Sequence, residues 1–317
     1  MLWETAKQAL FNQLDTRFTR LSGPRPFPSW TTGSTPIKKP VFFDRRIQTW
    51  ETTSVPFKIH WHYGVQVYIY PGEEVSRCIY LTGMYEPNQM SFLSSFLKKG
   101  MNLIDVGAHS GAYSLFFAKK VGPSGKVIAV EPSPREYARL VTHQQLNSFT
   151  NLIPIHRAAY DTEEGSLDLK VAKEPHTGHN TVGSFAYPEA NLDRTEKVVT
   201  TTLDHLVESN KICHLDAVKI DAEGSEKYVL LGAKEIIRRD HPVFLIEIFD
   251  AALKKCGSSG SEVWWILTEQ GYSFFQFSQE TGLPVAVANF PGMPYTDFIA
   301  IHKDDNKNIK LINDMSV

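Results

Sequence analysis

The chain has 317 residues, 42% of them apolar, which is enough to bury the core of one large α/β domain with an N-terminal extension. Its net charge of −2 gives no electrostatic reason to expect nucleic acid as a partner, and no run of about 18 apolar residues predicts an integral membrane segment. The three cysteines, Cys78, Cys213 and Cys256, lie far apart without zinc-ligand spacing, which favours reduced thiols in a cytoplasmic protein.

Residues 1–79 are predicted to form the N-terminal extension. Apolar residues recur at helical spacing over positions 3–18, which predicts an amphipathic helix. We expect this helix to pack on its own domain or to join two subunits in a homodimer, and membrane-surface binding is the alternative. Five prolines in residues 23–40 predict an extended segment. Alternating runs at 57–62 and 65–70 predict a β-hairpin.

Residues 80–303 are predicted to form the main domain, followed by a polar C-terminal tail at 304–317. The expected strands are Asn102–Val106, Lys126–Glu131, Leu152–His156, Ala217–Asp221, Val243–Ile248, Ser273–Phe277 and Asp297–His302. The expected helices between them are Tyr113–Val121, Pro134–Asn147, Ser225–Arg238 and Ser261–Gln270. This alternation predicts a doubly wound α/β fold with a mainly parallel sheet covered on both faces. The longer polar segment 161–199 is expected to be an insertion over the site.

A glycine-rich turn follows the first expected strand of this domain. The strand delivers Asp105 at its carboxyl end, and Gly107 and Gly111 then lead into a helix. Ligands of open α/β sheets bind beyond the carboxyl ends of the strands, and glycine lets the backbone approach a ligand closely. A dinucleotide fingerprint would need glycine at position 109. His109 stands there instead, which argues against an NAD(P)-dependent oxidoreductase.

Charged residues end the neighbouring strands as well. Glu131 ends the next strand, where it is placed to accept hydrogen bonds from both ribose hydroxyls of a nucleoside. The strand that carries Lys219 and Asp221 leads into Glu223, and residues two apart on a strand face the same side. Glu247 lies near the end of the following strand. Buried strand ends seldom hold this many charges without ion pairs or ligands.

Several short segments of the sequence carry a resemblance to a known family. They are Tyr85-Glu86-Pro87, Ile104–Gly111, Val130–Ser133, Thr202-Leu203-Asp204 and Val218–Glu226. From about Tyr80 to His302 the sequence resembles the FkbM-type methyltransferase family. The resemblance implies the class I methyltransferase fold, a Rossmann-like seven-stranded sheet that binds S-adenosylmethionine (SAM). It implies that the glycine turn holds the methionine part of SAM and that Glu131 holds the ribose.

The residues that we expect to bind SAM are drawn from these patterns. They are Glu86, Asp105, Gly107, Ala108, His109, Gly111, Glu131, Pro132, Asp161 and Asp221. His109 departs from the family, whose members often carry asparagine there. We expect this change to alter loop contacts without abolishing SAM binding.

The function that the sequence predicts is SAM-dependent methylation of a hydroxyl on a small molecule or a sugar-containing metabolite. The sulfonium methyl is already activated, so the protein needs mainly to align the acceptor and remove its proton. N-methylation, methylation of RNA or protein, and a non-catalytic SAM-binding protein remain alternatives. The charged group between Lys219 and Glu226 favours catalysis.

The candidate catalytic residues are Lys219, Asp221 and Glu223, with His179 of the polar insertion as the base. A solvated loop histidine is the alternative interpretation of His179. We favour a site without metal, in which the charged residues form an ion-pair network. If Mg²⁺ binds instead, Asp221 and Glu247 are the expected ligands, because carboxylate oxygens suit this ion.

Overall fold

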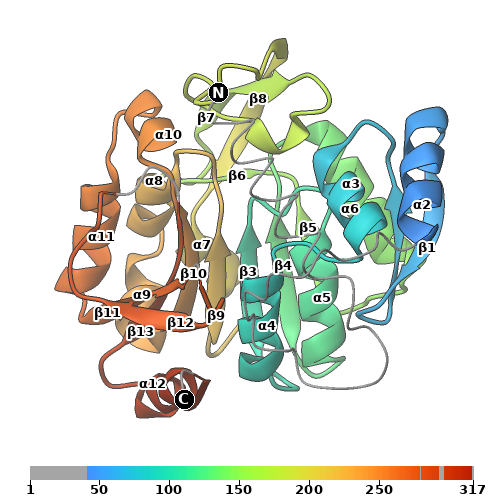
Figure 1. Cartoon of the computed structure of the whole chain (residues 1–317). Coiled ribbons are helices and arrows are strands. Elements are labelled where there is room, and N and C mark those ends of the chain that lie inside the picture. The colour runs from blue at the N-terminus through green and yellow to red at the C-terminus, as the bar shows by residue number, and fades with distance from the viewer. Residues whose placement is uncertain (1–40, 279, 293–295, 316–317) are drawn as a thin grey trace.

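The computed structural model describes residues 41–278, 280–292 and 296–315 (Figure 1). Within these residues, eight strands form the central sheet in the order β12-β11-β13-β10-β9-β3-β4-β5. Their bounds in that order are Pro284–Val287, Tyr272–Phe277, Thr296–His302, Val243–Ile248, Ala217–Ile220, Asn102–Val106, Lys126–Val130 and Leu152–Ile155. The strands from β10 to β5 pair in parallel, and β13 pairs antiparallel with β10 and β11. The predicted doubly wound, mainly parallel α/β fold is confirmed, with β12 as an additional edge strand.

Helices cover both faces of this sheet (Figure 1). One face packs against α4 (Pro87–Phe96), α5 (Ala112–Val121), α6 (Pro134–Leu146) and α12 (Asn306–Met315). The other packs against α7 (Leu203–Ser209), α8 (Glu226–Leu231), α9 (Lys234–Asp240), α10 (Asp250–Lys255) and α11 (Gly260–Glu269). Successive strand residues point to opposite faces, so Leu103 of β3 joins the first core and Ile104 the second. Burial on both faces accounts for the apolar central strands.

The predicted hairpin is formed by β1 (Phe57–Trp61) and β2 (Val65–Ile69). Val67 lies in the same core as Phe116 of α5, and helix α3 (Glu74–Thr82) runs across the boundary expected at residue 80. The described part of the extension therefore packs against the main domain and shares its core. The predicted amphipathic helix and proline-rich segment, and with them the predicted homodimer contact, lie outside the described residues. Helix α2 spans Val41–Thr52.

The insertion forms a second, smaller sheet in the order β6-β8-β7. Its strands are β6 (Ala158–Ala159), β7 (Ser166–Ala172) and β8 (Leu192–Thr201), with the short 3₁₀ turn η2 (Thr177–His179) after β7. In Figure 1, β7 and β8 lie above one end of the central strands. That end is the carboxyl end of β9, because the hydroxyl of Thr181 donates to the carbonyl oxygen of Glu223 at 2.8 Å.

Two expected elements differ in the structure. The single helix expected at 225–238 is divided into α8 and α9. Gly232 lies at the division, and a Cβ there would stand 2.0 Å from the carbonyl oxygen of Tyr160. The expected polar tail at 304–317 contains helix α12, whose Ile312 is buried in the first core. A strongly amphipathic helix can look polar in sequence because few of its residues are buried. Among the described residues, no helix is long and apolar enough to cross a membrane.

Gly107 provides a stability test of the close contact between β3 and β9. Its φ is +71°, and a Cβ there would lie 1.7 Å from the carbonyl oxygen of Asp221. We expect Gly107→Ala to lower the free energy of unfolding by about 3 kcal/mol, from left-handed strain and forced separation of the two strand ends. Denaturant unfolding measures this loss. Gly83→Ala is the control, because its φ of +74° is also left-handed but the nearest atom to an added Cβ would lie 4.0 Å away; equal losses in both variants would contradict the contact.

Candidate active site

The loop between β3 and α5 is fixed to the neighbouring strand. The N–H groups of Gly107 and Ala108 both donate to the carbonyl oxygen of Val130, at 3.0 and 3.1 Å. Gly107, His109 and Gly111 all have positive φ, a region that histidine, like asparagine, enters more readily than most side chains. The backbone of His109 can therefore adopt the left-handed conformation that this turn requires.

Glu131 lies directly behind this loop. Its Oε2 accepts the N–H of His109 and its Oε1 accepts the N–H of Ser133, each at 2.8 Å. Burial raises the pKa of Glu131 to about 7, against the lowering effect of His109. A carboxylate has about four lone-pair sites, so each oxygen can accept one further hydrogen bond. The geometry suits a ligand with two neighbouring hydroxyls.

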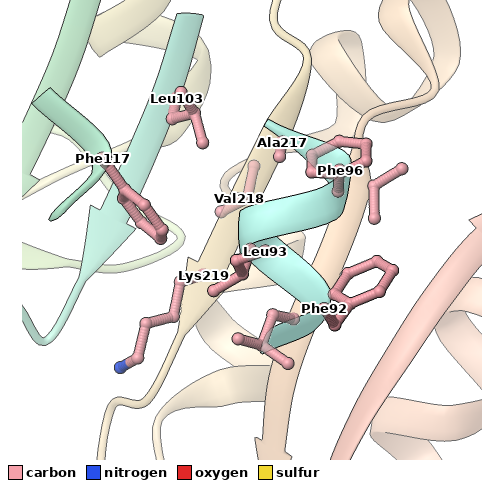
Figure 2. A pocket seen from close by; sticks show the side chains of 10 residues that line it. Phe92, Leu93, Phe96, Leu103, Phe117, Ala217, Val218 and Lys219 are labelled. Atoms are coloured by element: carbon pink, nitrogen blue, oxygen red, sulfur yellow. The ribbon is translucent and has the colours of Figure 1, made fainter. Parts of the chain in front are cut away.

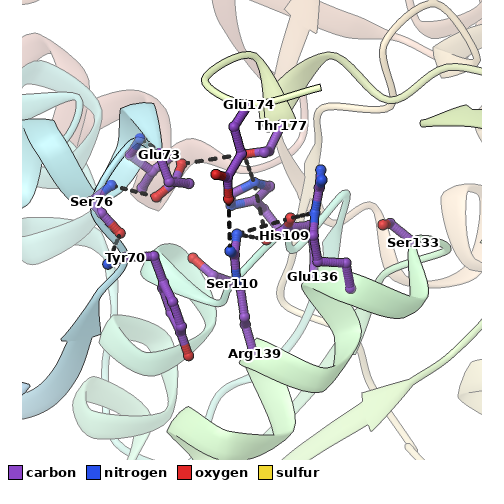
Figure 3. A network of polar contacts seen from close by, with 12 residues as sticks. Tyr70, Glu73, Ser76, His109, Ser110, Ser133, Glu136, Arg139, Glu174 and Thr177 are labelled. Atoms are coloured by element: carbon purple, nitrogen blue, oxygen red, sulfur yellow. Dashed lines mark hydrogen bonds and ion pairs between the residues drawn. The ribbon is translucent and has the colours of Figure 1, made fainter. Parts of the chain in front are cut away.

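The His109 side chain ties the loop to three other segments (Figure 3). Its Nε2 lies 3.1 Å from the hydroxyl of Thr177 in the insertion and 3.4 Å from a carboxylate oxygen of Glu136 on α6. The Thr177 hydroxyl is also 3.5 Å from Glu73 beside α3. Burial acts to raise the pKa of Glu136, but His109 and Arg139 outweigh it and lower the pKa. The loop, α6, the insertion and α3 thus share one polar network.

A buried lysine stands at the carboxyl end of β9. The Nζ of Lys219 is 3.1 Å from Asp221 Oδ2 and 4.8 Å from the ring centre of Tyr113. Burial acts to lower the pKa of Lys219, but the charges of Asp221 and Asp105 raise it above its usual range. Asp105 accepts the hydroxyl of Ser114 at 2.5 Å through Oδ2, while its buried Oδ1 has no hydrogen-bond partner. Lys219 is therefore a fixed cation among acids.

Three further acids surround this cation. Glu86 precedes α4 with a φ of 42° and accepts the phenolic O–H of Tyr113, and burial raises its pKa. Asp297 lies opposite Glu247 in the β10–β13 pairing and accepts Gln89 at 2.5 Å. Burial, with the charge of Glu86, raises the pKa of Asp297 to about 8. Burial and nearby acids raise the pKa of Glu247 well above its usual range.

The turn after β9 is held by one of its own acids. Glu226 Oε1 accepts the N–H groups of Ala222 and Gly224, at 2.9 and 3.1 Å. Glu226 therefore caps the turn, and burial raises its pKa to about 7. This arrangement places Glu223, with a φ of 47°, at the edge of the site.

His179 meets Glu223 across the turn. Its Nδ1 is 2.9 Å from Glu223 Oε1, and its ring packs on Tyr187 with a centroid distance of 3.9 Å. Tyr187 packs in turn on Phe249 after β10, at 5.1 Å. Burial acts to lower the pKa of His179, but the hydrogen bond to Glu223 raises it overall. A histidine held by a carboxylate is the arrangement of an oriented general base.

The structure brings together the acids expected to bind Mg²⁺. One oxygen each of Asp221, Glu223 and Glu247 lies within 4.8 Å of the other two. Oxygen ligands of this kind suit a hard dication. Lys219 at 3.1 Å from Asp221 supplies a competing positive charge, as an ion-pair network requires.

Two expected SAM residues lie apart from these acids. Asp161 is exposed at the start of the insertion, where it accepts the hydroxyl of Thr162 at 2.9 Å. The carbonyl oxygen of Pro132 lies 3.1 Å from the ring of His156. The described contacts thus give Asp161 no link to the strand-end acids.

The sequence analysis missed several residues of the site. They are Glu73, Tyr113, Glu136, Thr177, Tyr187 and Asp297. Asp297 had a recognisable signal, because it begins an expected strand whose antiparallel direction brings its first residues to the carboxyl edge of β10. Tyr187 and Thr177 lie in a loop whose path no periodicity predicts.

A small pocket beneath α4 belongs to the core. It is lined by apolar side chains from α4, α5 and the central strands, together with Lys219. Figure 2 shows that the lysine stem runs past this pocket and carries its nitrogen away from Phe92 and Phe96. Lys219 thus packs its stem against the core while its charge reaches the strand ends.

Comparison with known proteins places this site in a family. A model of the methyltransferase FkbM domain matches residues 105–274, more than half of the chain. The chain is similar to ribosomal RNA large subunit methyltransferase E of Oleidesulfovibrio alaskensis, with 30% identity over 98 residues, which cover 30% of this chain and 47% of that protein. It is similar to the protein of the same name from Buchnera aphidicola, with 43% identity over 42 residues, 13% of this chain and 20% of that protein. The chain thus spans less than half the length of these curated relatives.

Two solved structures are also similar. One is an rRNA methylase from Streptococcus thermophilus, with 12% identity, a TM-score of 0.39, and coverage of 68% of this chain and 93% of that chain. The other is a SAM-dependent O-methyltransferase from Thermotoga maritima, with 15% identity, a TM-score of 0.38, and coverage of 78% and 77%. The family match contains the glycine loop, Glu131 and the Lys219–Glu226 turn. The chain therefore belongs to the FkbM methyltransferase domain family.

Proposed function

We propose that the protein transfers the methyl group of SAM to a hydroxyl of a small molecule or a sugar-containing metabolite. The pairing of His179 with Glu223 at 2.9 Å carries this proposal, because a hydroxyl acceptor must lose its proton. Family membership supports methyl transfer and SAM as the donor. When bound, SAM supplies a methyl group already activated by the positive sulfur.

The residues of the glycine loop fit SAM. Glu131 keeps acceptor capacity on both oxygens beside the loop, as two ribose hydroxyls require. The buried Oδ1 of Asp105 has no hydrogen-bond partner, and an ammonium group is a suitable donor for it. Gly107 leaves no room for a side chain against the carbonyl oxygen of Asp221, so the loop stays close to the end of β9.

The charge of the site also fits this donor. Burial raises the pKa values of Glu86, Asp105 and Glu247, because it penalises their charged forms. SAM carries a sulfonium and an ammonium group, and such charges favour the ionised carboxylates.

The chain's own residues would then remove the acceptor proton. Because the ring nitrogen Nδ1 of His179 is bonded to Glu223, Nε2 is the atom that accepts the hydroxyl proton. Lys219 holds Asp221 and shapes the floor of the site. Removal of a proton by a positioned base is worth about 10²–10⁴-fold in rate. In this proposal no metal is needed.

RNA is the second candidate acceptor, favoured by the names of the two curated relatives. Phosphate-rich ligands bind through positive charge. The chain has a net charge of −2, and the acids Glu74 and Glu223 lie close to His179 of the insertion. We therefore favour the smaller hydroxyl acceptor.

Glu131→Ala tests the donor site. We expect it to weaken SAM binding by about 2–3 kcal/mol, because a charged acceptor of two hydrogen bonds is lost. Calorimetry measures the affinity. Glu235→Ala, at an exposed ion pair on α9, is the matched control. SAM affinity unchanged in Glu131→Ala would remove the donor site from the proposal.

The pKa of about 7 at Glu131 makes SAM binding depend on pH. Below pH 7 the carboxyl gains a proton and stops accepting two hydroxyls, so affinity falls as pH falls. For a single group of pKa 7 we expect about tenfold weaker binding at pH 6 than at pH 8. Glu131→Gln should flatten the profile measured by calorimetry. An identical slope in both proteins would assign the dependence elsewhere.

His179→Ala tests the base. Incubation of metabolite extracts with SAM labelled on its methyl group will identify the acceptor, and hydroxyl methylation is the expected product. Turnover should then fall about 10²-fold or more in His179→Ala and should survive EDTA. His205→Ala, which removes an exposed histidine on α7, should keep full turnover. Loss of activity with EDTA and its return with Mg²⁺ would instead make Asp221 and Glu247 ligands, and labelled RNA would favour the second candidate.

A further inference from the structure

The insertion presents two histidines to helix α3. His176 and His179 lie three residues apart around η2, and side chains three apart on a 3₁₀ turn lie on the same side. Glu74, the first residue of α3, faces them. One ligand atom of each residue lies within 4.8 Å of the other two. All three side chains are half-buried, so an ion from solvent can reach them.

The backbone on both sides of this group is held in place. Glu73 caps α3 by accepting the N–H groups of Val75 and Ser76, at 2.7 and 2.6 Å. It also lies 3.5 Å from the hydroxyl of Thr177, which is fully buried between the two histidines. Because Glu73 carries out the capping, the carboxylate of Glu74 is not needed for it.

A second observation that points to a metal ligand is the hydrogen-bond partner of His179. A histidine that binds a metal almost always donates its other ring N–H to a carboxylate, a carbonyl or water, which fixes the ring. The Nδ1 of His179 has such a partner in Glu223 Oε1, at 2.9 Å. The ring of His176 stacks on that of His179 at a centroid distance of 5.9 Å.

We propose that Glu74, His176 and His179 bind a divalent transition metal of the Zn²⁺ type. Two imidazoles and one carboxylate, with water in a fourth position, are ligands that this ion prefers, at about 2.0–2.2 Å. Three atoms bonded to one ion at these distances lie no more than about 4.4 Å apart, so small side-chain movements from the present positions close the site. Glu223 orients His179 from behind.

Zinc binding has a consequence for the enzyme that rests on the proposed function. The ion bonds to Nε2 of His179, the atom that would accept the acceptor proton. The zinc-bound protein therefore lacks its base, and zinc acts as an inhibitor. Neither Glu74 nor His176 is the proposed base, so His176 can be changed while His179 is kept.

The first experiment measures Zn²⁺ alone, by competition between the full chain and a chromophoric chelator. We expect one zinc ion per chain at this site. His176→Asn and Glu74→Gln should weaken its binding tenfold or more, and Glu223→Gln about 10–100-fold, as outer partners of metal ligands do. His205→Asn and Cys213→Ser, which remove an exposed histidine and an exposed thiol, are the controls. Zinc affinity unchanged in His176→Asn and Glu74→Gln, with both variants folded by circular dichroism, would overturn the site.

The second experiment measures transfer of labelled methyl groups to the acceptor. Zinc should inhibit the wild-type protein, and EDTA should relieve the inhibition. His176→Asn should keep the basal rate and resist zinc at concentrations that inhibit the wild type. Activation by zinc would overturn the inhibitory role. If zinc binding depends on His176 but the protein transfers no methyl group to a hydroxyl, the metal site is valid and the proposed function fails.

Discussion

The buried ion pair of Lys219 with Asp221 is the interaction on which the rest of the site depends. Lys219 lies within an acidic group that includes Asp105 and Glu86, whose charges outweigh the burial that would otherwise lower its pKa. Loss of one partner of a buried pair leaves an uncompensated charge, which typically costs about 3–5 kcal/mol. The lysine thus allows acids to meet at the strand ends, and the contact of Gly107 with the Asp221 carbonyl fixes how closely the strands approach.

The same strand ends connect the donor loop to the insertion. His109 bonds through its backbone N–H to Glu131 and through its ring to Thr177. Thr177 lies in η2 directly before Gly178 and His179. A displacement of the insertion therefore affects both the proposed ribose acceptor and the proposed base. His109 thus links two parts of the site, the donor loop and the insertion.

Local patterns in the sequence predicted the central sheet but not the fold of the insertion. Strands such as β3 and β10 match their expected bounds because apolar runs between glycine and charged residues are encoded locally. The close approach of Gly232 to the backbone of Tyr160, more than seventy positions away, is a contact that no local pattern contains. The position of His179 opposite Glu223 likewise depends on how a long polar segment folds back. The acids at the strand ends could be predicted because parallel strands share one carboxyl edge, whereas their partners Tyr113 and Tyr187 could not.

The charge at the strand ends differs from the net charge of the chain. The net charge of the chain is only −2. The strand ends nevertheless bring together four acids whose pKa values are all raised, namely Glu86, Asp105, Glu247 and Asp297. Burial penalises the charged forms of these acids, and a bound cation favours those forms. Under the proposed function, the donor brings a positive sulfur that the product no longer has once the methyl group has left. A site with surplus acid therefore binds the donor more strongly than the spent product. The positive donor then offsets part of the free-energy cost of burying these acids. This difference favours the exchange of product for fresh donor.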